Sequence, residues 1–450
     1  MKEEYKTDLI YTLADRPPVR DSIFAALQHL LAIFVGIITP TLVIGGILGL
    51  EAEIPYLISM SLIVSGMATF IQIKRFGPIG SGLLSIQGTS FAFLGAILSA
   101  GLLVRSRGGS SQEILGVIFG MCFLGAFIEM ILSRFLHHLK KVITPTVTGI
   151  VVSLIGLSLI KVGLTDMAGG QWLLDNRPEE FGSFENLGLA FLVLIIIVIF
   201  NRSRNQFLRM SSIVIGLVAG YTVSLFLGIV DLSSLRNLPA VSIPIPFKYG
   251  FGFRWEAFVP IALVYLITTI ESIGDLTATS MVSREPIQGD LYIKRIKGGV
   301  LGDGFNSALA AIFNTFPNTT FSQNNGVIQL TGVASRYVGI YIAGLLVLLG
   351  LFPLIGGVFQ QMPKPVLGGA TIIMFGTVAA AGIKIIASHK IDRRAMMIIA
   401  ISFSMGLGVQ LVPQALNNLP ETLRNIFSAP VTTGGLTAII TNLVLPVVDK

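Results

Sequence analysis

The sequence predicts an all-α polytopic membrane protein. Of its 450 residues, 53% are hydrophobic and only 12% are charged, whereas soluble domains carry roughly 25% charged residues. Its mean hydropathy is +0.80. Apolar runs recur along the whole chain, and most approach the length of about 20 residues that a membrane-spanning helix needs. We therefore expect about fourteen transmembrane segments, near residues 23–50, 55–73, 84–103, 113–135, 143–161, 185–200, 211–229, 256–275, 298–315, 320–333, 337–360, 366–384, 395–412 and 430–447.

The basic residues favour an even number of spans with both termini in the cytoplasm. In that orientation, 22 of the 31 Lys and Arg residues lie on the cytoplasmic side and nine on the opposite side. Cytoplasmic loops are enriched in Lys and Arg. One span more or fewer would move every later loop to the opposite side of the membrane and weaken this bias. A smaller bundle with bent helices is the alternative. Residues 1–22 are charged and lack an apolar signal sequence, so we expect them to form a cytoplasmic N-terminal segment.

Two segments differ from ordinary spans. The third, "FGPIGSGLLSIQGTSFAF" (76–93), and the tenth, "FNTFPNTTFSQNNGVIQLTG" (313–332), are rich in Gly, Ser, Thr and Pro and contain short runs of extended character. These positions are equivalent in two copies of a seven-span unit, and an odd number of spans inverts one copy relative to the other. Paired interruptions at matching places indicate a substrate site near the membrane midplane. We expect two inverted repeats, 23–230 and 231–450.

Ionisable residues within apolar spans are candidate functional residues, because placing them in lipid is expensive. Glu271 and Asp275 are four residues apart in the eighth span and therefore share one helix face. In a partly dry site their repulsion favours a proton on one of them, although Asp275 could also face water at the helix end. Asp303 in the ninth span either relays a proton or bridges helices. His29 in the first span, judged alone, is more often a packing residue than a ligand.

Amide side chains in the tenth span predict the kind of solute. Gln323 and Asn324 each offer a donor and an acceptor, and an amide pairs well with the cis-amide edge of a planar heterocycle. A carboxylate such as Glu271 accepts hydrogen bonds from ring N–H groups. A simple inorganic anion would instead favour Arg, and no Arg lies deep in the spans. Phe91 and Phe93 either stack on such a ring or face lipid.

Composition also argues against other classes of protein. A single cysteine, Cys122, excludes a disulfide framework and a cysteine metal site. The four histidines do not suggest a histidine-rich metal centre. With no visible nucleophile–base pair or metal cluster, we expect no enzyme activity, no cofactor and no bound metal. Membrane lipid and a small-molecule substrate are the expected partners, and nucleic acid is not.

The stretch "QNNGVIQLTG" (323–332) resembles the signature of the nucleobase–ascorbate transporters, the nucleobase:cation symporter-2 family. That signature reads Gln, Glu or Pro, then Asn, any residue, Gly, four further residues, Thr, and Arg, Lys or Gly. The likeness extends over nearly the whole chain and is greatest to the bacterial xanthine permeases. Further similar stretches are "DRPP" (15–18), "QHLLAIFVGIITP" (28–40), "GSGLLSIQGTSFAF" (80–93), "ITPTVTGIVVSLIGLSLIKVG" (143–163), "ESIGDLTATS" (271–280) and "NNGVIQLTGVASRYVG" (324–339).

The resemblance implies an architecture and an activity. It implies a core domain from spans 1–4 and 8–11 and a gate domain from spans 5–7 and 12–14, with short β-strands in spans 3 and 10 at the substrate site. It implies a homodimer joined through the gates, in the inner (plasma) membrane. The expected activity is import of xanthine or a closely related oxopurine by proton symport, with an elevator-like or rocking movement. A urate or uracil permease and a non-transporting nucleobase receptor or channel are alternatives, and Na⁺ is an alternative coupling ion.

The resemblance also assigns roles to residues at the expected substrate site. Glu271 corresponds to the substrate-binding carboxylate of span 8 and Gln323 to the substrate-binding amide of span 10. Asn324 corresponds to the neighbour that sets affinity. The backbone around Phe91 and Ser90 completes the site. Ser90 departs from the Asn found here in some xanthine permeases, and this position tunes purine selectivity in the family, so the choice among oxopurines stays open.

Three further residues correspond to positions that support transport in the family. Asp275 and Asp303 match carboxylates that transport requires. His29 matches the histidine of span 1 that supports the substrate site, a role that its isolated position in an apolar run does not predict by itself.

Overall fold

A computed structural model describes residues 9–136, 144–387, 391–420, 423–424 and 427–445. Parts of three predicted segments lie outside this description: residues 1–8 of the N-terminal segment, the first residue of the span at 143–161, and the last two residues of the span at 430–447. Six of the basic residues in the charge count also lie outside it: Lys2, Lys6, Lys140, Lys141, Lys390 and Lys450.

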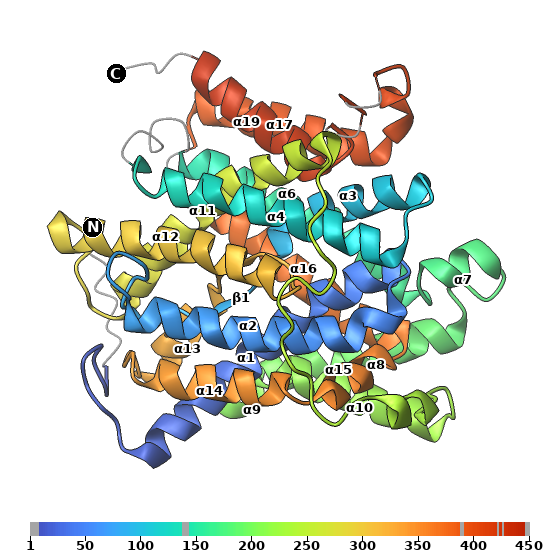
Figure 1. Cartoon of the computed structure of the whole chain (residues 1–450), viewed down its shortest axis with the longest axis horizontal. Coiled ribbons are helices and arrows are strands. Elements are labelled where there is room, and N and C mark those ends of the chain that lie inside the picture. The colour runs from blue at the N-terminus through green and yellow to red at the C-terminus, as the bar shows by residue number, and fades with distance from the viewer. Residues whose placement is uncertain (1–8, 137–143, 388–390, 421–422, 425–426, 446–450) are drawn as a thin grey trace.

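The described part of the chain is mostly helical (Figure 1). Eight of its helices are long and apolar enough to cross a membrane, or up to nine if α14 and α15 form one bent span. The eight are α1 (Val19–Ile47), α2 (Ile54–Lys74), α4 (Ser111–Leu132), α6 (Pro145–Met167), α8 (Phe184–Asn201), α11 (Trp255–Val282), α16 (Lys364–Ala387) and α17 (Arg393–Leu411). The chain is therefore a mostly helical, polytopic membrane protein.

The remaining α-helices of the described residues are shorter or more polar. They are α3 (Leu94–Ser106), α7 (Gln171–Asn176), α9 (Gln206–Met210), α10 (Ser212–Phe226), α12 (Gly289–Ile312), α13 (Gln323–Thr331), α14 (Val338–Gly350), α15 (Pro353–Gln360) and α19 (Pro430–Val444). The segment predicted as one span at 337–360 consists of α14 and α15, which are bent by 71° at the break between them. Pro353 begins α15, and proline disfavours helical backbone at the residue before it.

The two segments that the sequence singled out each contain a strand followed by a short helix. Strand β1 (Gln87–Thr89) precedes α3, and strand β2 (Asn318–Thr320) precedes α13. At about 1.5 Å per residue, α3 is about 20 Å long and α13 about 14 Å. Both are shorter than the roughly 30 Å hydrocarbon core of a bilayer, so each helix starts within the protein and not at a membrane surface.

Strands β1 and β2 pair with each other in the interior. They run antiparallel, and every residue of both strands is buried. Lipid offers no hydrogen-bond partners, so an unpaired strand at this depth would leave its backbone groups unsatisfied. Pairing with each other satisfies backbone groups of both strands. The register places Gln87 opposite Thr320, Gly88 opposite Thr319, and Thr89 opposite Asn318.

Two glycines allow the chain to follow this path. A Cβ on Gly88 would lie 2.6 Å from Cζ of Phe321 and 2.8 Å from Cγ1 of Ile37, so only glycine lets β1 approach these side chains. Gly80, in the turn between α2 and β1, has a φ of +98°, and a Cβ there would lie 2.5 Å from the carbonyl oxygen of Ile71. Glycine adopts such backbone at no steric cost.

The long helices pack in two groups. The first, which we call the strand-bearing group, contains α1–α4, β1, α11–α14 and β2; within it α2 packs along α14 and α4 along α12. The second group contains α6, α8, α10, α16, α17 and α19, and its most extensive contact joins α6 to α16. Contacts between the groups are sparser. In Figure 1, β1 lies near the centre of the molecule, while α17 and α19 lie along its upper edge.

Candidate substrate site

A cavity of about 290 Å³ lies between the two groups of helices. The strand-bearing group contributes residues of α1, α11, β2, the start of α13 and the turn before α3, and the second group contributes residues of α6, α10 and α16. Small-molecule sites range from roughly 300 to 1,000 Å³, so this cavity is of a size for one compact ligand. The cavity lies where the two interrupted segments meet.

Glu271 and Gln323 both line this cavity. Glu271 lies in α11, and its Oε2 atom is buried without a hydrogen-bond partner among the described residues. Gln323 begins α13 and is exposed. A buried polar atom without a partner costs about 1–3 kcal/mol, so the cavity favours a ligand that donates a hydrogen bond to Glu271. No described Lys or Arg lines the cavity, which disfavours a simple anion there.

Phe91 supplies an aromatic ring to the cavity wall. Its ring meets that of Phe375 on α16 edge-to-face, with 5.9 Å between the ring centroids and 82° between the planes. Phe93 is fully buried instead and packs edge-on against Tyr265, with 4.5 Å between centroids. Of the two phenylalanines, Phe91 is thus the one placed to stack on a bound ring.

Ser90 and Asn324 lie behind the cavity wall. Ser90 is buried, and its hydroxyl accepts a hydrogen bond of 3.3 Å from the backbone N–H of Ala92. Asn324 is also buried, and its side-chain amide donates to the carbonyl of Leu84. Both side chains therefore shape the backbone at the starts of the short helices, and neither lines the cavity.

Asp303 holds three helices together in the interior. Its Oδ1 accepts a hydrogen bond of 2.6 Å from Nε2 of Gln72 on α2, and its Oδ2 accepts one from the hydroxyl of Ser272 on α11. The Gln72 amide also donates to the carbonyl of Gly299 at 2.8 Å and accepts from the backbone N–H of Ser81 at 2.9 Å. Asp303 is thus the bridge between helices that the sequence allows.

Asp275 lies one helical turn from Glu271 and accepts a hydrogen bond of 3.1 Å from Oγ1 of Thr320 on β2. Glu271 is close enough to both Asp275 and Asp303 for the three carboxyl groups to interact electrostatically. Charges that interact in a medium of low dielectric repel strongly. The three groups therefore form one acidic cluster beside the cavity, and Glu129 of α4 adjoins this cluster.

His29 is completely buried in α1, beside Asn324 of α13. Neither of its ring nitrogens has a hydrogen-bond partner among the described residues. The histidine therefore lies behind the cavity wall and does not line the cavity.

The structure adds residues that the sequence did not identify. Gln72 had a visible signal, since it is a glutamine within an apolar run. The cavity residues from the second group are, apart from Thr377, apolar, and they had no visible signal because an apolar side chain has the same hydropathy whether it faces lipid or a ligand. They are Val152 and Ile155 on α6, Ile213 on α10, and Met374, Thr377, Val378 and Ala381 on α16.

Comparison with solved structures identifies the fold. The murine Solute Carrier 26 family member A9 (Slc26a9) anion transporter, solved in an inward-facing state, superimposes with a TM-score of 0.65. The superposition covers 95% of this chain and 68% of that chain, at 12% sequence identity. At such low identity the likeness concerns the fold alone.

Closer relatives are found by sequence. The chain is 50% identical to the xanthine permease XanP of Escherichia coli (strain K12) over 442 residues, which cover 98% of this chain and 95% of XanP. It is 49% identical to the xanthine permease XanQ of the same organism over 441 residues, which cover 98% of this chain and 94% of XanQ.

A family model described as a permease family matches residues 20–415. The match includes the cavity, both strands and the acidic cluster. Together with the relatives, it means that the chain belongs to the nucleobase–ascorbate transporter family of permeases and is a transporter and not an enzyme.

Proposed function

We propose that this chain imports xanthine, or a closely related oxopurine, by proton symport. The observation that carries the proposal is the cavity between the two groups of helices, which Glu271, Gln323 and Phe91 line together. Relatives named xanthine permeases, about half identical over nearly the whole chain, support the substrate class.

The lining groups suit a neutral, planar heterocycle. The Glu271 carboxylate accepts a hydrogen bond from a ring N–H, and the Gln323 amide both donates to and accepts from a lactam edge. Phe91 stacks against the ring face. Ala92, two residues before α3, and Ser322, directly before α13, line the cavity, so the positive ends of two helix dipoles favour the exocyclic oxygens of an oxopurine there. Ser90, behind the wall, influences this backbone and hence the choice among oxopurines.

The element order supports fourteen spans in two inverted repeats, 23–230 and 231–450. Two long helices, a short strand, a short helix and another helix occur in the first half as α1, α2, β1, α3 and α4 and recur in the second as α11, α12, β2, α13 and α14. In this correspondence α12 is the counterpart of α2, and α14 is the counterpart of α4. The packing of α2 on α14 therefore has its counterpart in the packing of α12 on α4. The antiparallel pairing of β1 with β2 is also what an inverted repeat requires. With this topology both termini lie in the cytoplasm and the protein spans the plasma membrane.

Transport then requires the core to move relative to the gate. In this proposal the strand-bearing group is the core, from spans 1–4 and 8–11, and the second group is the gate, from spans 5–7 and 12–14. The side chains that the gate contributes to the cavity are almost all apolar, and such a surface permits an elevator-like or rocking movement, because no polar bond has to break. Most of α8 and α17 is not buried within the chain, which supports a homodimer joined through the gates.

The acidic cluster supports proton coupling. Glu271, Asp275 and Asp303 interact without a described Lys or Arg at the cavity, so a bound proton lowers their repulsion and lets the cluster change environment during the movement. A sodium ion is the alternative, since carboxylates bind either ion.

Uptake of labelled xanthine, urate, guanine, hypoxanthine and uracil, with pH and sodium varied independently, tests the proposal. We expect saturable xanthine uptake that rises as the external pH falls and is indifferent to sodium. Uptake of uracil or urate in preference to xanthine would replace the substrate. Facilitated uptake without accumulation would indicate a channel, and binding without uptake would indicate a receptor.

A further inference from the structure

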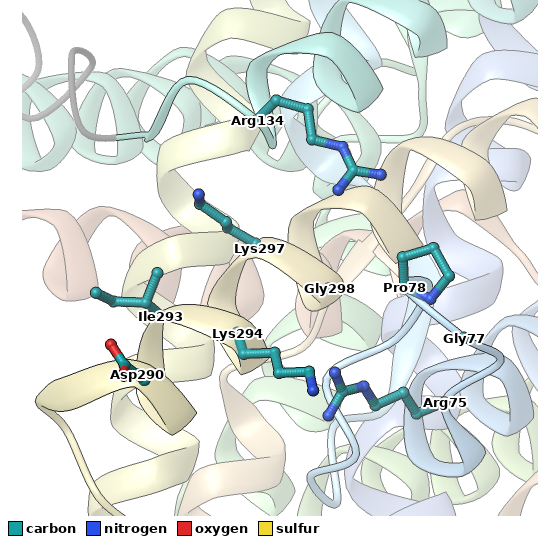
Figure 2. A pocket seen from close by; sticks show the side chains of 9 residues that line it. All are labelled: Arg75, Gly77, Pro78, Arg134, Asp290, Ile293, Lys294, Lys297 and Gly298. Carbon is teal, nitrogen blue, oxygen red and sulfur yellow. The ribbon is translucent and has the colours of Figure 1, made fainter.

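A second cavity, of about 550 Å³, lies at one end of α2, α4 and α12 (Figure 2). It shares no lining residue with the substrate cavity. Four basic residues line it: Arg75 after α2, Arg134 after α4, and Lys294 and Lys297 on α12. Among the described residues of the lining, Asp290 is the one that is acidic. The cavity is therefore a basic pocket with an excess of positive charge.

The charges of this basic pocket are not neutralised within the described part of the chain. None of its four basic side chains makes an ion pair there, whereas the neighbouring Arg295 pairs with Glu285 at 2.5 Å. Figure 2 shows the Lys294 side chain and the Arg75 guanidinium extending toward one another. Like charges that face each other repel, so an anion between them would stabilise the arrangement.

Backbone geometry gives the pocket a defined shape. Arg75 has a φ of +59° and Gly77 one of +60°, and a non-glycine residue in this left-handed region is uncommon. The turn that contains them lies directly on α12, because a Cβ on Gly298 would lie 2.4 Å from the carbonyl oxygen of Gly80. The backbone N–H of Gly80 also donates to the carbonyl of Gly298 at 2.7 Å. Arg75 is thus held toward the pocket by a tightly packed turn.

An apolar surface adjoins the basic pocket. Exposed apolar side chains recur at intervals of three and four residues along α4, so they share one helix face. A further exposed apolar side chain follows in the turn, next to Arg134 in the sequence. Ile293, in the lining itself, is 48% exposed. A free phosphate ion would use only the charges, whereas a lipid would use both surfaces. The apolar residues of α4 and its turn are Leu124, Phe127, Ile131 and Phe135.

We propose that the basic pocket binds the headgroup phosphate of an anionic phospholipid, with an acyl chain along the exposed face of α4. Basic pockets between transmembrane helices bind anionic headgroups in this way. In the proposed topology all four basic residues lie on the cytoplasmic side, so the lipid belongs to the inner leaflet. Binding at the pocket does not depend on which solute the chain transports.

Native mass spectrometry of the delipidated full chain tests the proposal, with phosphatidylglycerol and phosphatidylcholine offered at equal concentration. We expect the wild type to retain one phosphatidylglycerol in preference to phosphatidylcholine. The double variant Lys294→Gln/Lys297→Gln should bind it about 30-fold more weakly, at about 1 kcal/mol for each lysine near an anionic headgroup. Arg134→Gln should weaken binding about 5-fold and provides a second variant if the double one does not fold.

Arg202→Gln/Arg204→Gln is the matched control. Both arginines are exposed and lie in the loop after α8, outside the pocket, so the control removes the same charge and should keep wild-type binding. Equal losses in the two double variants, or no preference for phosphatidylglycerol, would overturn the proposal. Inorganic phosphate is a further arm: if it binds at the pocket while the two lipids bind equally, a free anion and not a lipid is the ligand.

Discussion

Gln72 donates a hydrogen bond of 2.6 Å to Asp303 in the interior of the protein and so joins α2 to α12. Both side chains are completely buried. Because the Gln72 amide is itself held by Gly299 and Ser81, the glutamine has one available orientation. It therefore positions the Asp303 carboxylate and does not itself line the cavity.

Replacing Gln72 by leucine should destabilise the protein. Leucine fills similar space but leaves Oδ1 of Asp303 and the backbone N–H of Ser81 without their Gln72 partner, and an unsatisfied buried group costs about 1–3 kcal/mol. We expect a lower midpoint of thermal unfolding in detergent, together with slower uptake. Gln112→Leu is the control, since Gln112 is exposed at the start of α4. An unchanged midpoint for Gln72→Leu would show that the Asp303 bridge does not stabilise the fold.

Removing the polar groups of the substrate cavity should abolish high-affinity uptake. In Glu271→Gln the charged acceptor is lost, and a hydrogen bond to a charged group is worth about 1.5–3 kcal/mol, so xanthine affinity should fall about 10- to 150-fold. Gln323→Ala should have a comparable effect. Transport assays with labelled xanthine and quantification of protein in the membrane separate binding from expression. Glu179→Gln, in an exposed loop, should transport normally; wild-type uptake in either cavity variant would refute their assigned role.

Phe91→Ala should weaken xanthine binding without removing it. An aromatic pair contributes about 0.5–1.5 kcal/mol beyond the area that it buries, which corresponds to about a 2- to 13-fold increase in KM. The variant also loses the contact with Phe375, so its thermal stability is measured in parallel. Phe184→Ala, which removes a side chain that is 97% exposed, should leave KM unchanged. If both variants have the wild-type KM, Phe91 does not contact the substrate.

Gly88→Ala should disturb the junction of the two strands. The added Cβ would lie 2.6 Å from Phe321, and overpacking of an interior typically costs about 1–3 kcal/mol. Gly95→Ala in α3 is the matched control, because nothing lies within 4 Å of a Cβ there and alanine is favoured over glycine in a helix by roughly 0.5–1 kcal/mol. Melting curves should therefore shift in opposite directions. A shift in the same direction for both would mean that β1 and Phe321 adjust freely.

The sequence predicted the features that depend on composition and spacing. Apolar runs located the helices, and the two interrupted segments located β1 and β2, because Gly, Ser and Thr at that depth conflict with a continuous helix. Glu271 and Gln323 were identifiable because polar side chains are costly within apolar spans and therefore indicate candidate functional residues. Both line the cavity in the structure.

The sequence could not predict which neighbouring side chain faces the cavity. Ser90 and Phe91 are adjacent, as are Gln323 and Asn324, yet only Phe91 and Gln323 line the cavity. Side-chain direction there depends on where β1 ends and α13 begins, and a shift of one residue exchanges the two members of each pair. The apolar residues from α16, such as Met374, could not be distinguished from residues that face lipid.

Accumulation of labelled xanthine in proteoliposomes under an imposed proton gradient tests the central claim most directly. With acid outside, sodium absent and Glu271 intact, we predict accumulation above the external concentration, which a protonophore abolishes and which Glu271→Gln vesicles do not reach. Xanthine that only equilibrates across the membrane of wild-type vesicles, or that accumulates only when sodium is supplied, would contradict the account.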